Sequence, residues 1–323
     1  MQNDSAKVSV IVLTYKKFDR IKDNIDSILR QTYKNYEIII SDDGSPNFDK
    51  AFIEDIIKKQ DLGEKFSIIN REKNVGTVKN FNDAVKAASG DIIVPLAQDD
   101  RFYDENALSN IVNAFMDPRI NLCLGLRAIR QTGDVLPNSV QIKIMHEGSL
   151  KKLWFRNACG NLYFGSALSY RKAFLRDIGY FDDNYVLLED YPLAMNCIEM
   201  GEAIYVIEKP IIEYSTDGMS HGKNISQIMK KDYYRMHERN YQYADNLLKS
   251  KICKRYLLYR MKASSSPCNR FEKYSNIIVD VIVVRSLIQA ALTKKQILDC
   301  RFDILWKFEM LATKIDTILS GKS

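Results

Sequence analysis

Residues 8–15 read VSVIVLTY, residues 37–41 read EIIIS and residues 91–96 read DIIVPL. Each is a short apolar run rich in β-branched residues, the pattern of a strand buried on both faces of a parallel sheet. A similar run over residues 66–69 predicts a further strand. Between the runs, apolar residues recur at the spacing of amphipathic helices. Such helices are predicted within residues 21–29, 52–57, 81–88 and 108–115. This alternation implies an α/β fold with a doubly wound, mostly parallel sheet flanked by helices.

After residue 121 the rhythm changes. Strand-like runs cover residues 122–129, 162–170 and 203–212, whereas residues 131–156 show no clear period and predict a mobile loop or an insertion. Beyond Asn224 the pattern is helical. It predicts helices over residues 225–262 and 277–319, broken near Ser264–Pro267. We therefore expect a domain over residues 1–223 and a C-terminal helical region over residues 224–323.

The composition is that of an ordinary globular protein. The 323 residues are 46% hydrophobic and 27% charged, with 14 glycines and 7 prolines, which excludes collagen-like and low-complexity chains. Six dispersed cysteines form no CxxC pair, so zinc fingers and disulfide scaffolds are not expected. The polar residues 1–7 lack the pattern of a signal peptide, and the longest apolar tract, residues 277–292, contains two charges. We expect a cytoplasmic protein without a membrane-spanning helix.

Charge is distributed unevenly. Residues 224–323 hold 19 Lys and Arg against 9 Asp and Glu, whereas residues 1–223 hold 28 against 32. A basic helical region favours an anionic partner such as the inner face of the plasma membrane, to which the protein would bind peripherally. A solvated helical face would explain the same charges without a partner. A homodimer through the C-terminal helices is a further alternative. A nucleic-acid partner would rest on charge alone and is not expected.

Polar residues gather where the predicted strands end. The first strand ends in Thr14-Tyr15, the second in Asp42-Asp43, and the fourth is followed by Gln98-Asp99-Asp100. Ligands of open α/β sheets bind beyond the carboxyl ends of the strands. An aromatic ring beside carboxylates suits a nucleotide diphosphate, because the ring stacks on the base while the carboxylates hold a divalent cation, Mn²⁺ or Mg²⁺. The sequence has no glycine-rich phosphate loop of the GxGxxG or GxxxxGK[ST] type.

An ordered set of motifs resembles family 2 glycosyltransferases, especially bacterial members that build surface polysaccharides. The resemblance covers about residues 7–223, and the C-terminal hundred residues add nothing to it. The motifs are VSVIV with Thr14-Tyr15, Gln31-Thr32-Tyr33, Asp42-Asp43-Gly44-Ser45, Asn74-Val75-Gly76 with Asn80, Ser89-Gly90-Asp91-Ile92, Gln98-Asp99-Asp100, Ile178–Asp182 and Glu189–Leu193.

The resemblance implies a GT-A fold and an inverting transfer of a sugar from a nucleotide-diphosphate donor to an acceptor hydroxyl. Carried over by position, Tyr15 and Asp43 hold the base and Asp99 lies near the ribose. Asp100 ligates the metal, and Asp190 is the catalytic base, with Glu189 in reserve. Two further residues complete the expected nucleotide-sugar site: Thr14, and Lys79 where the family often has arginine.

Each assignment has a structural alternative. Asp42 fits a turn or cap residue, and Asp99 and Asp100 would also cap the helix that follows them. Glu189 or Asp190 would serve as an N-cap, since Pro192 belongs in a first helical turn. A helix N-terminus would also lower the basicity of Asp190. His221, in a polar loop after the last strand, is either a third metal ligand or simply solvated.

The sequence thus predicts a metal-dependent, inverting glycosyltransferase for bacterial capsule, O-antigen or exopolysaccharide synthesis. Its acceptor would be a saccharide or a lipid-linked molecule. The absence of a QxxRW motif favours single-sugar addition over processive polymer synthesis. A sugar-phosphate nucleotidyltransferase and a non-catalytic scaffold that binds nucleotide sugars are the alternatives.

Overall fold

The computed structural model describes residues 6–58, 65–146, 149–216, 225–264, 282, 285–286, 288–289 and 297–320. Its contacts divide the chain into two compact units. Met1–Ile142 together with Tyr163–Ile225 form the sheet unit, and Lys143–Leu162 together with Ser226–Ser323 form the helical unit. The sequence places a boundary after residue 223, close to the division between Ile225 and Ser226, but it does not predict that residues 143–162 group with the C-terminal helices.

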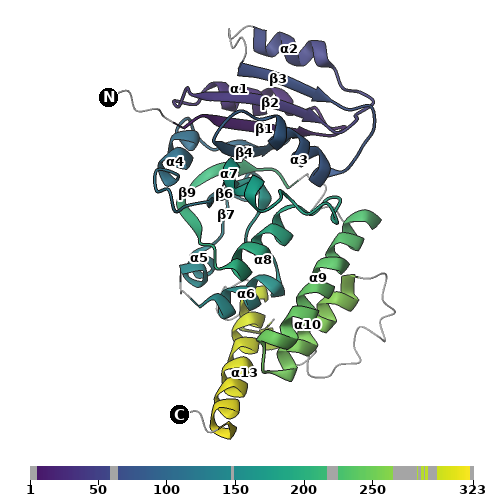
Figure 1. Cartoon of the computed structure of the whole chain (residues 1–323). Coiled ribbons are helices and arrows are strands. Elements are labelled where there is room, and N and C mark those ends of the chain that lie inside the picture. The colour runs from purple at the N-terminus through teal and green to yellow at the C-terminus, as the bar shows by residue number, and fades with distance from the viewer. Residues whose placement is uncertain are drawn as a thin grey trace. The chain divides into compact units, whose positions relative to one another are not determined.

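The described strands of the sheet unit form a nine-stranded sheet in the order β3-β2-β1-β4-β8-β6-β9-β5, with β7 paired to β6 (Figure 1). The strands are β1 (Val8–Thr14), β2 (Tyr36–Asp42), β3 (Phe66–Asn70), β4 (Ile92–Ala97), β5 (Arg101–Phe102), β6 (Leu122–Ile129), β7 (Val135–Leu136), β8 (Leu168–Arg171) and β9 (Ile204–Tyr214). β1 to β4 pair in parallel, as predicted. Beyond β4 the sheet is mixed: β6 and β9 are parallel, but the pairings of β8, β7 and β5 are antiparallel. The predicted α/β class with C-terminal helices is confirmed.

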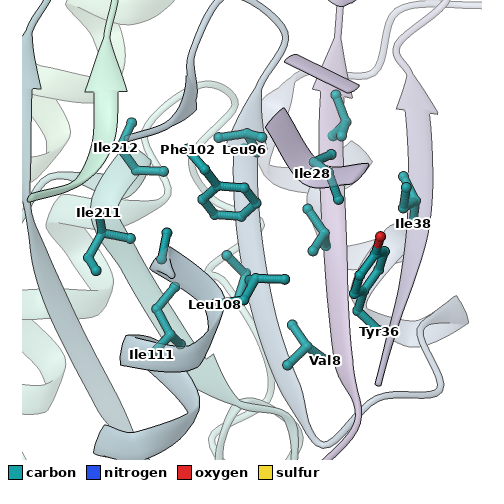
Figure 2. Packing of buried hydrophobic residues seen from close by; sticks show 14 of the residues in the cluster. Val8, Ile28, Tyr36, Ile38, Leu96, Phe102, Leu108, Ile111, Ile211 and Ile212 are labelled. Atoms are coloured by element: carbon teal, nitrogen blue, oxygen red, sulfur yellow. The ribbon is translucent and has the colours of Figure 1, made fainter. Parts of the chain in front are cut away.

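The core of the sheet unit lies between the strands and three helices. Apolar side chains of β1, β2 and β4 pack with α1 (Ile21–Leu29), α2 (Lys50–Lys58) and α4 (Ala107–Ala114) in one buried cluster. Figure 2 shows Ile28 of α1 and Leu108 and Ile111 of α4 among the apolar side chains of this cluster. The intervening residues Ser9 and Ile11 of β1 are also buried, and α3 (Thr77–Ala87) contacts β1 and β2. This two-sided burial explains why β1 is mostly apolar.

The parallel register places the ends of three strands side by side. Thr14 pairs with Asp42, and Leu13 pairs with Ala97, so that β1, β2 and β4 end at the same edge of the sheet. The polar residues that follow these strands are therefore neighbours in space, although they are tens of residues apart in sequence.

Two predictions for the middle of the chain need correction. Residues 131–156, expected to be a mobile loop or an insertion, are not a loop: they contain β7, α5 (Ser139–His146) and most of α6 (Leu150–Cys159). Ser149 caps α6 by accepting the Lys152 amide, and the second half of the helix, residues 154–159, is buried. The strand expected over residues 162–170 is confined to β8, because Gly165–Ala167 form a 3₁₀ turn. Two further helices, α7 (Lys172–Asp177) and α8 (Asp190–Met200), complete this region.

The helical unit contains α6 together with α9 (Gln227–Leu247), α10 (Lys251–Ser264) and α13 (Ile297–Leu319) (Figure 1). The single helix predicted over residues 225–262 is interrupted between α9 and α10. There the amides of Lys249 and Ser250 donate to the buried carboxylate of Glu309 on α13 instead of continuing the helix. Most of the predicted helix from residue 277 to residue 296 lies outside the described residues.

Candidate active site

The turn after β2 is held by a buried carboxylate. Asp42 accepts hydrogen bonds from the Thr14 hydroxyl (2.9 Å) and from both the amide and the hydroxyl of Ser45 (2.7 Å each). Asp42 is thus a turn residue, the alternative that the sequence predicts for it. Thr14, which is expected at the nucleotide-sugar site, uses its hydroxyl to stabilise this turn.

Asp43 clamps the loop that precedes α3. Its carboxylate accepts hydrogen bonds from the amides of Val75 (2.7 Å) and Gly76 (3.0 Å) and from the side-chain amide of Asn74 (2.7 Å). Burial raises the pKa of Asp43, while these donors oppose the shift. Gly44 follows at φ +74°, where a Cβ would lie 2.5 Å from the backbone of the facing loop. The first, third and fourth motifs of the resemblance, which contain Thr14, Asp42–Ser45 and Asn74–Gly76, thus form one hydrogen-bonded unit.

Tyr15 lies at the same edge of the sheet. Its amide donates to Gln98 (2.9 Å), and the Gln98 side chain donates back to the Tyr15 carbonyl (3.0 Å). The ring is half-buried, and the Lys16 ammonium lies 4.6 Å from its centroid. An aromatic face and the Asp43 turn are therefore both present at the carboxyl end of the parallel strands.

The cation that acts on the Asp43 carboxylate is Arg71, whereas Lys79 is exposed. Arg71 follows β3, and its guanidinium donates to Asn80 (3.0 Å) and Asp83 (2.5 Å), while its charge acts on Asp43. Lys79 has an exposed side chain, 3.7 Å from Asp83. Arg71 is not among the residues predicted from the sequence, although a basic residue directly after the third strand is a usable signal.

The loop after β4 carries Asp99 and Asp100. The side-chain amide of Asn24, on α1, donates to the carbonyls of Ala97 (2.8 Å) and Asp100 (2.9 Å) and so fixes this loop. The Asp100 Oδ1 accepts the Ser215 amide (2.8 Å), whereas its Oδ2 is buried without a hydrogen-bond partner. Burial raises the pKa of Asp100 well above its ordinary value. Asp99 beside it is half-buried.

Asp190 is the first residue of α8. Its Oδ2 accepts the Gly165 amide (2.8 Å) and its Oδ1 accepts the Tyr191 amide (2.6 Å). Glu189 occupies the N-cap position, but its side chain does not cap the helix. Burial raises the pKa of Asp190, although the two amides favour the ionised form. Space at Gly165 is tight, because a Cβ there would lie 2.6 Å from Glu189 Oε1 and 3.2 Å from the Asp190 Cβ.

One arginine acts electrostatically on both carboxylates. Arg127 of β6 is 7% exposed, and its guanidinium carbon lies 3.6 Å from the ring centroid of Phe164 and 4.4 Å from that of Tyr214. Its charge interacts with both Asp100 and Asp190. Arg127 is not among the residues predicted from the sequence either. Its signal was a lone charge in the apolar run LCLGLRAI over residues 122–129.

Comparison with known proteins identifies the family. The model of glycosyl transferase family 2 matches residues 9–178, which is more than half of the chain. The chain belongs to glycosyl transferase family 2. It is therefore a glycosyltransferase, as the sequence predicts.

Known relatives of this family 2 glycosyltransferase are distant. The poly-beta-1,6-N-acetyl-D-glucosamine synthase of Staphylococcus epidermidis is 25% identical over 180 residues, 55% of this chain and 43% of that protein. The match thus spans less than half of the relative's length. Residues 1–349 of S. aureus TarS, solved with UDP, superpose with a TM-score of 0.58 at 17% identity, over 98% of this chain and 92% of that one. The mannosyltransferase PcManGT of Pyrobaculum calidifontis, solved with GDP-Man and Mn²⁺, gives 0.57 at 15% identity, over 99% and 89%. These structures show that the fold is of the GT-A type.

The donor set of this glycosyltransferase suits a hard divalent cation. Asp100 offers a buried oxygen that no described group uses, and Asp99 adjoins it. Magnesium is commonly bound by one or two carboxylates together with substrate phosphates, and manganese accepts the same oxygen ligands. Within the described residues, no group of three or more His, Cys, Asp or Glu side chains could hold a metal. His221, the third ligand expected from the sequence, lies outside them. None of the helices in the described part of the chain is long and apolar enough to cross a membrane.

The clamp around Asp43 gives a first prediction. Replacing Asp43 by Asn removes one acceptor and points an amide at N–H donors, so D43N should unfold with a free energy lower by about 1–3 kcal/mol. Urea denaturation measures this loss. The surface variant D19N is the matched control and should leave the unfolding free energy unchanged, since Asp19 is exposed. Equal stabilities of D43N and wild type would contradict the clamp.

Proposed function

We propose that this glycosyltransferase is an inverting, metal-dependent enzyme that moves one sugar from a nucleotide-diphosphate donor to a hydroxyl of a saccharide or lipid-linked acceptor. The observation that carries the proposal is the pairing of Asp100, with its unused buried oxygen, and Asp190 around the charge of Arg127. Complexes of TarS with UDP and of PcManGT with GDP-Man and Mn²⁺ support a donor and a metal of this kind. The polysaccharide synthase among the relatives supports a role in surface-polysaccharide synthesis.

The side chains divide the chemistry between them. Tyr15 stacks on the base, the loop clamped by Asp43 orders the nucleotide end, and Lys79 with Arg71 supplies positive charge there. Asp99 and Asp100 would hold the cation, which supplies compensating charge to the departing diphosphate. Asp190 takes the proton of the acceptor hydroxyl. The acceptor oxygen bonds to the anomeric carbon from the face opposite the leaving group, and the nucleoside diphosphate departs with the electron pair of the broken bond.

Asp190 is better suited to this role than Glu189. Gly165 and Tyr191 fix both of its oxygens, and its raised pKa makes the ionised carboxylate a stronger base than an ordinary aspartate. The carboxylate accepts a proton only when ionised, so activity should rise as the pH increases through its folded-state pKa. Family membership favours this transfer over nucleotidyl transfer and over a non-catalytic scaffold.

The donor class and the metal are tested by binding. Calorimetric titration of UDP, GDP, dTDP and CMP, each with and without Mn²⁺, should show one nucleotide that binds tightly only with the metal. D100N should lose the metal-dependent part of the affinity, because the amide removes the anionic ligand. D91N, an exposed aspartate before β4, is the matched control. Binding that is indifferent to Mn²⁺ in wild type would overturn the metal dependence.

The base is tested by kinetics. D190N should lower kcat by about 10²–10⁴-fold with little change in donor affinity, the usual contribution of a positioned base. E189Q should retain most of the activity. In wild type the acidic limb of the pH profile of kcat/KM should lie above the pKa range of an ordinary aspartate, in accord with the direction of the shift. A larger loss in E189Q than in D190N would exchange the two roles.

We further propose that the basic helices bind an anionic membrane surface from the cytoplasmic side. Ile228, Lys231 and Arg235 are exposed at the spacing of one face of α9, which joins an apolar anchor to positive charge. Homodimerisation through the exposed apolar residues of α13 is the alternative. These residues are Met310, Leu311, Ile315 and Leu319.

Vesicle sedimentation separates these two uses. Wild type should sediment with vesicles that contain phosphatidylserine but not with neutral ones. Salt at about 0.5 M should release it, because salt screens the attraction between surface charges and anionic lipids. The variant K231E/R235E should lose this binding, whereas R30E/K34E, a matched charge reversal at exposed sites of the sheet unit, should keep it. A dimer by analytical ultracentrifugation without vesicle binding would favour the alternative.

A further inference from the structure

Arg127 is a buried cation in the interior of the sheet. It belongs to β6, which is hydrogen-bonded to strands on both sides, and its side chain is 7% exposed. A charge that is taken out of water is normally paired with an opposite charge in hydrogen-bond contact, because desolvation costs several kcal/mol, on the order of the energy of a strong ion pair. We therefore expect an anionic hydrogen-bond partner for Arg127.

The described residues do not provide such a partner. The Nε of Arg127 is buried without a hydrogen-bond partner, and the guanidinium forms no ion pair with a described carboxylate within 4.0 Å. Asp100 and Asp190 act on it through their charges alone. Burial lowers the pKa of Arg127, yet arginine stays protonated at neutral pH. The cation is present, and none of the described residues accepts a hydrogen bond from its guanidinium.

Two aromatic rings fix its position instead. The guanidinium carbon lies 3.6 Å from the ring centroid of Phe164 and 4.4 Å from that of Tyr214. Cation–π contacts engage the faces of a guanidinium and leave its N–H bonds, which lie in its plane, free to donate. Phe164 directly precedes Gly165, whose amide binds Asp190, and Tyr214 directly precedes Ser215, whose amide binds Asp100. The same two segments thus hold the arginine and both carboxylates.

We propose that Arg127 binds a phosphate oxyanion of a substrate at the site of Asp100 and Asp190, through N–H donors that the two rings hold in a fixed plane. The proposal rests on the function proposed above and adds a residue and a ligand chemistry to it. The phosphate has two sources: the diphosphate of the donor, or a phosphate carried by the acceptor. The carboxylates alone would repel such a group, so binding should be strongest when Mn²⁺ offsets their charge.

Calorimetry on R127M, R127K and wild type, all with Mn²⁺, separates the two sources. If the donor is the source, R127M should bind the nucleoside diphosphate preferred by wild type about 10- to 100-fold more weakly, and the matching monophosphate nearly as well as wild type does. If the acceptor is the source, nucleotide affinities should stay unchanged. Inorganic phosphate should then bind to the nucleotide-saturated wild type but not to R127M.

Controls keep the test decisive. R130M removes a nearby cation whose partner is Glu213, and it should bind every probe as wild type does. R127K retains the charge but not the planar fork, so a phosphate-binding role predicts a partial loss, whereas a purely structural role predicts full rescue. This distinction remains measurable if R127M does not fold. Wild-type affinities in R127K and R127M for diphosphate and phosphate would overturn the inference. A wild type that binds no nucleoside diphosphate would instead overturn the proposed function, and titration of free protein with phosphate would still test Arg127.

Discussion

The site depends on one constraint: a carboxylate removed from water must find hydrogen-bond donors. Backbone amides meet that requirement, most of them from segments distant in sequence, and so they join the site together. The carboxylates and their backbone donors are Asp43 with Val75 and Gly76, Asp100 with Ser215, and Asp190 with Gly165 and Tyr191. Each carboxylate thereby fixes the loop that donates to it, and that loop in turn holds the carboxylate in place. Burial raises the pKa of all three aspartates despite these bonds, and such shifted pKa values are typical of functional sites.

Much of the first half of the fold follows from the sequence. The apolar runs that become β1, β2 and β4 are buried on both faces, so their pattern is unambiguous. The second half was harder to predict, because its strands pair with partners far along the chain. Individual hydrogen bonds also set where its turns form and where its helices end. The 3₁₀ turn at Gly165 forms where the amide must reach Asp190, and the break between α9 and α10 forms where Glu309 captures two amides. Neither partner can be inferred from periodicity.

The site was predictable only in part, for a similar reason. Asp42, Asp43, Asp99 and Asp100 follow strand ends, so their placement was inferred from the order of the strands. Arg127, Arg71 and Asn24 act through contacts across the sheet unit. Arg127 stands in an apolar strand, and Asn24 has its partners in the loop after β4. A lone polar residue within an apolar run is a signal that deserves weight, because burial makes it costly unless it serves a purpose.

The central claim is that Asp100 and Asp190 face the reacting end of a nucleotide-sugar donor. A crystal structure with Mn²⁺ and the nucleoside diphosphate that binds best tests this most directly. The account predicts anomalous density for manganese beside Asp100 Oδ2 and the base beside Tyr15 and Asp43, with Asp190 on the same side of the sheet as the diphosphate. A nucleotide bound elsewhere, or manganese held by residues other than Asp99 and Asp100, would contradict it.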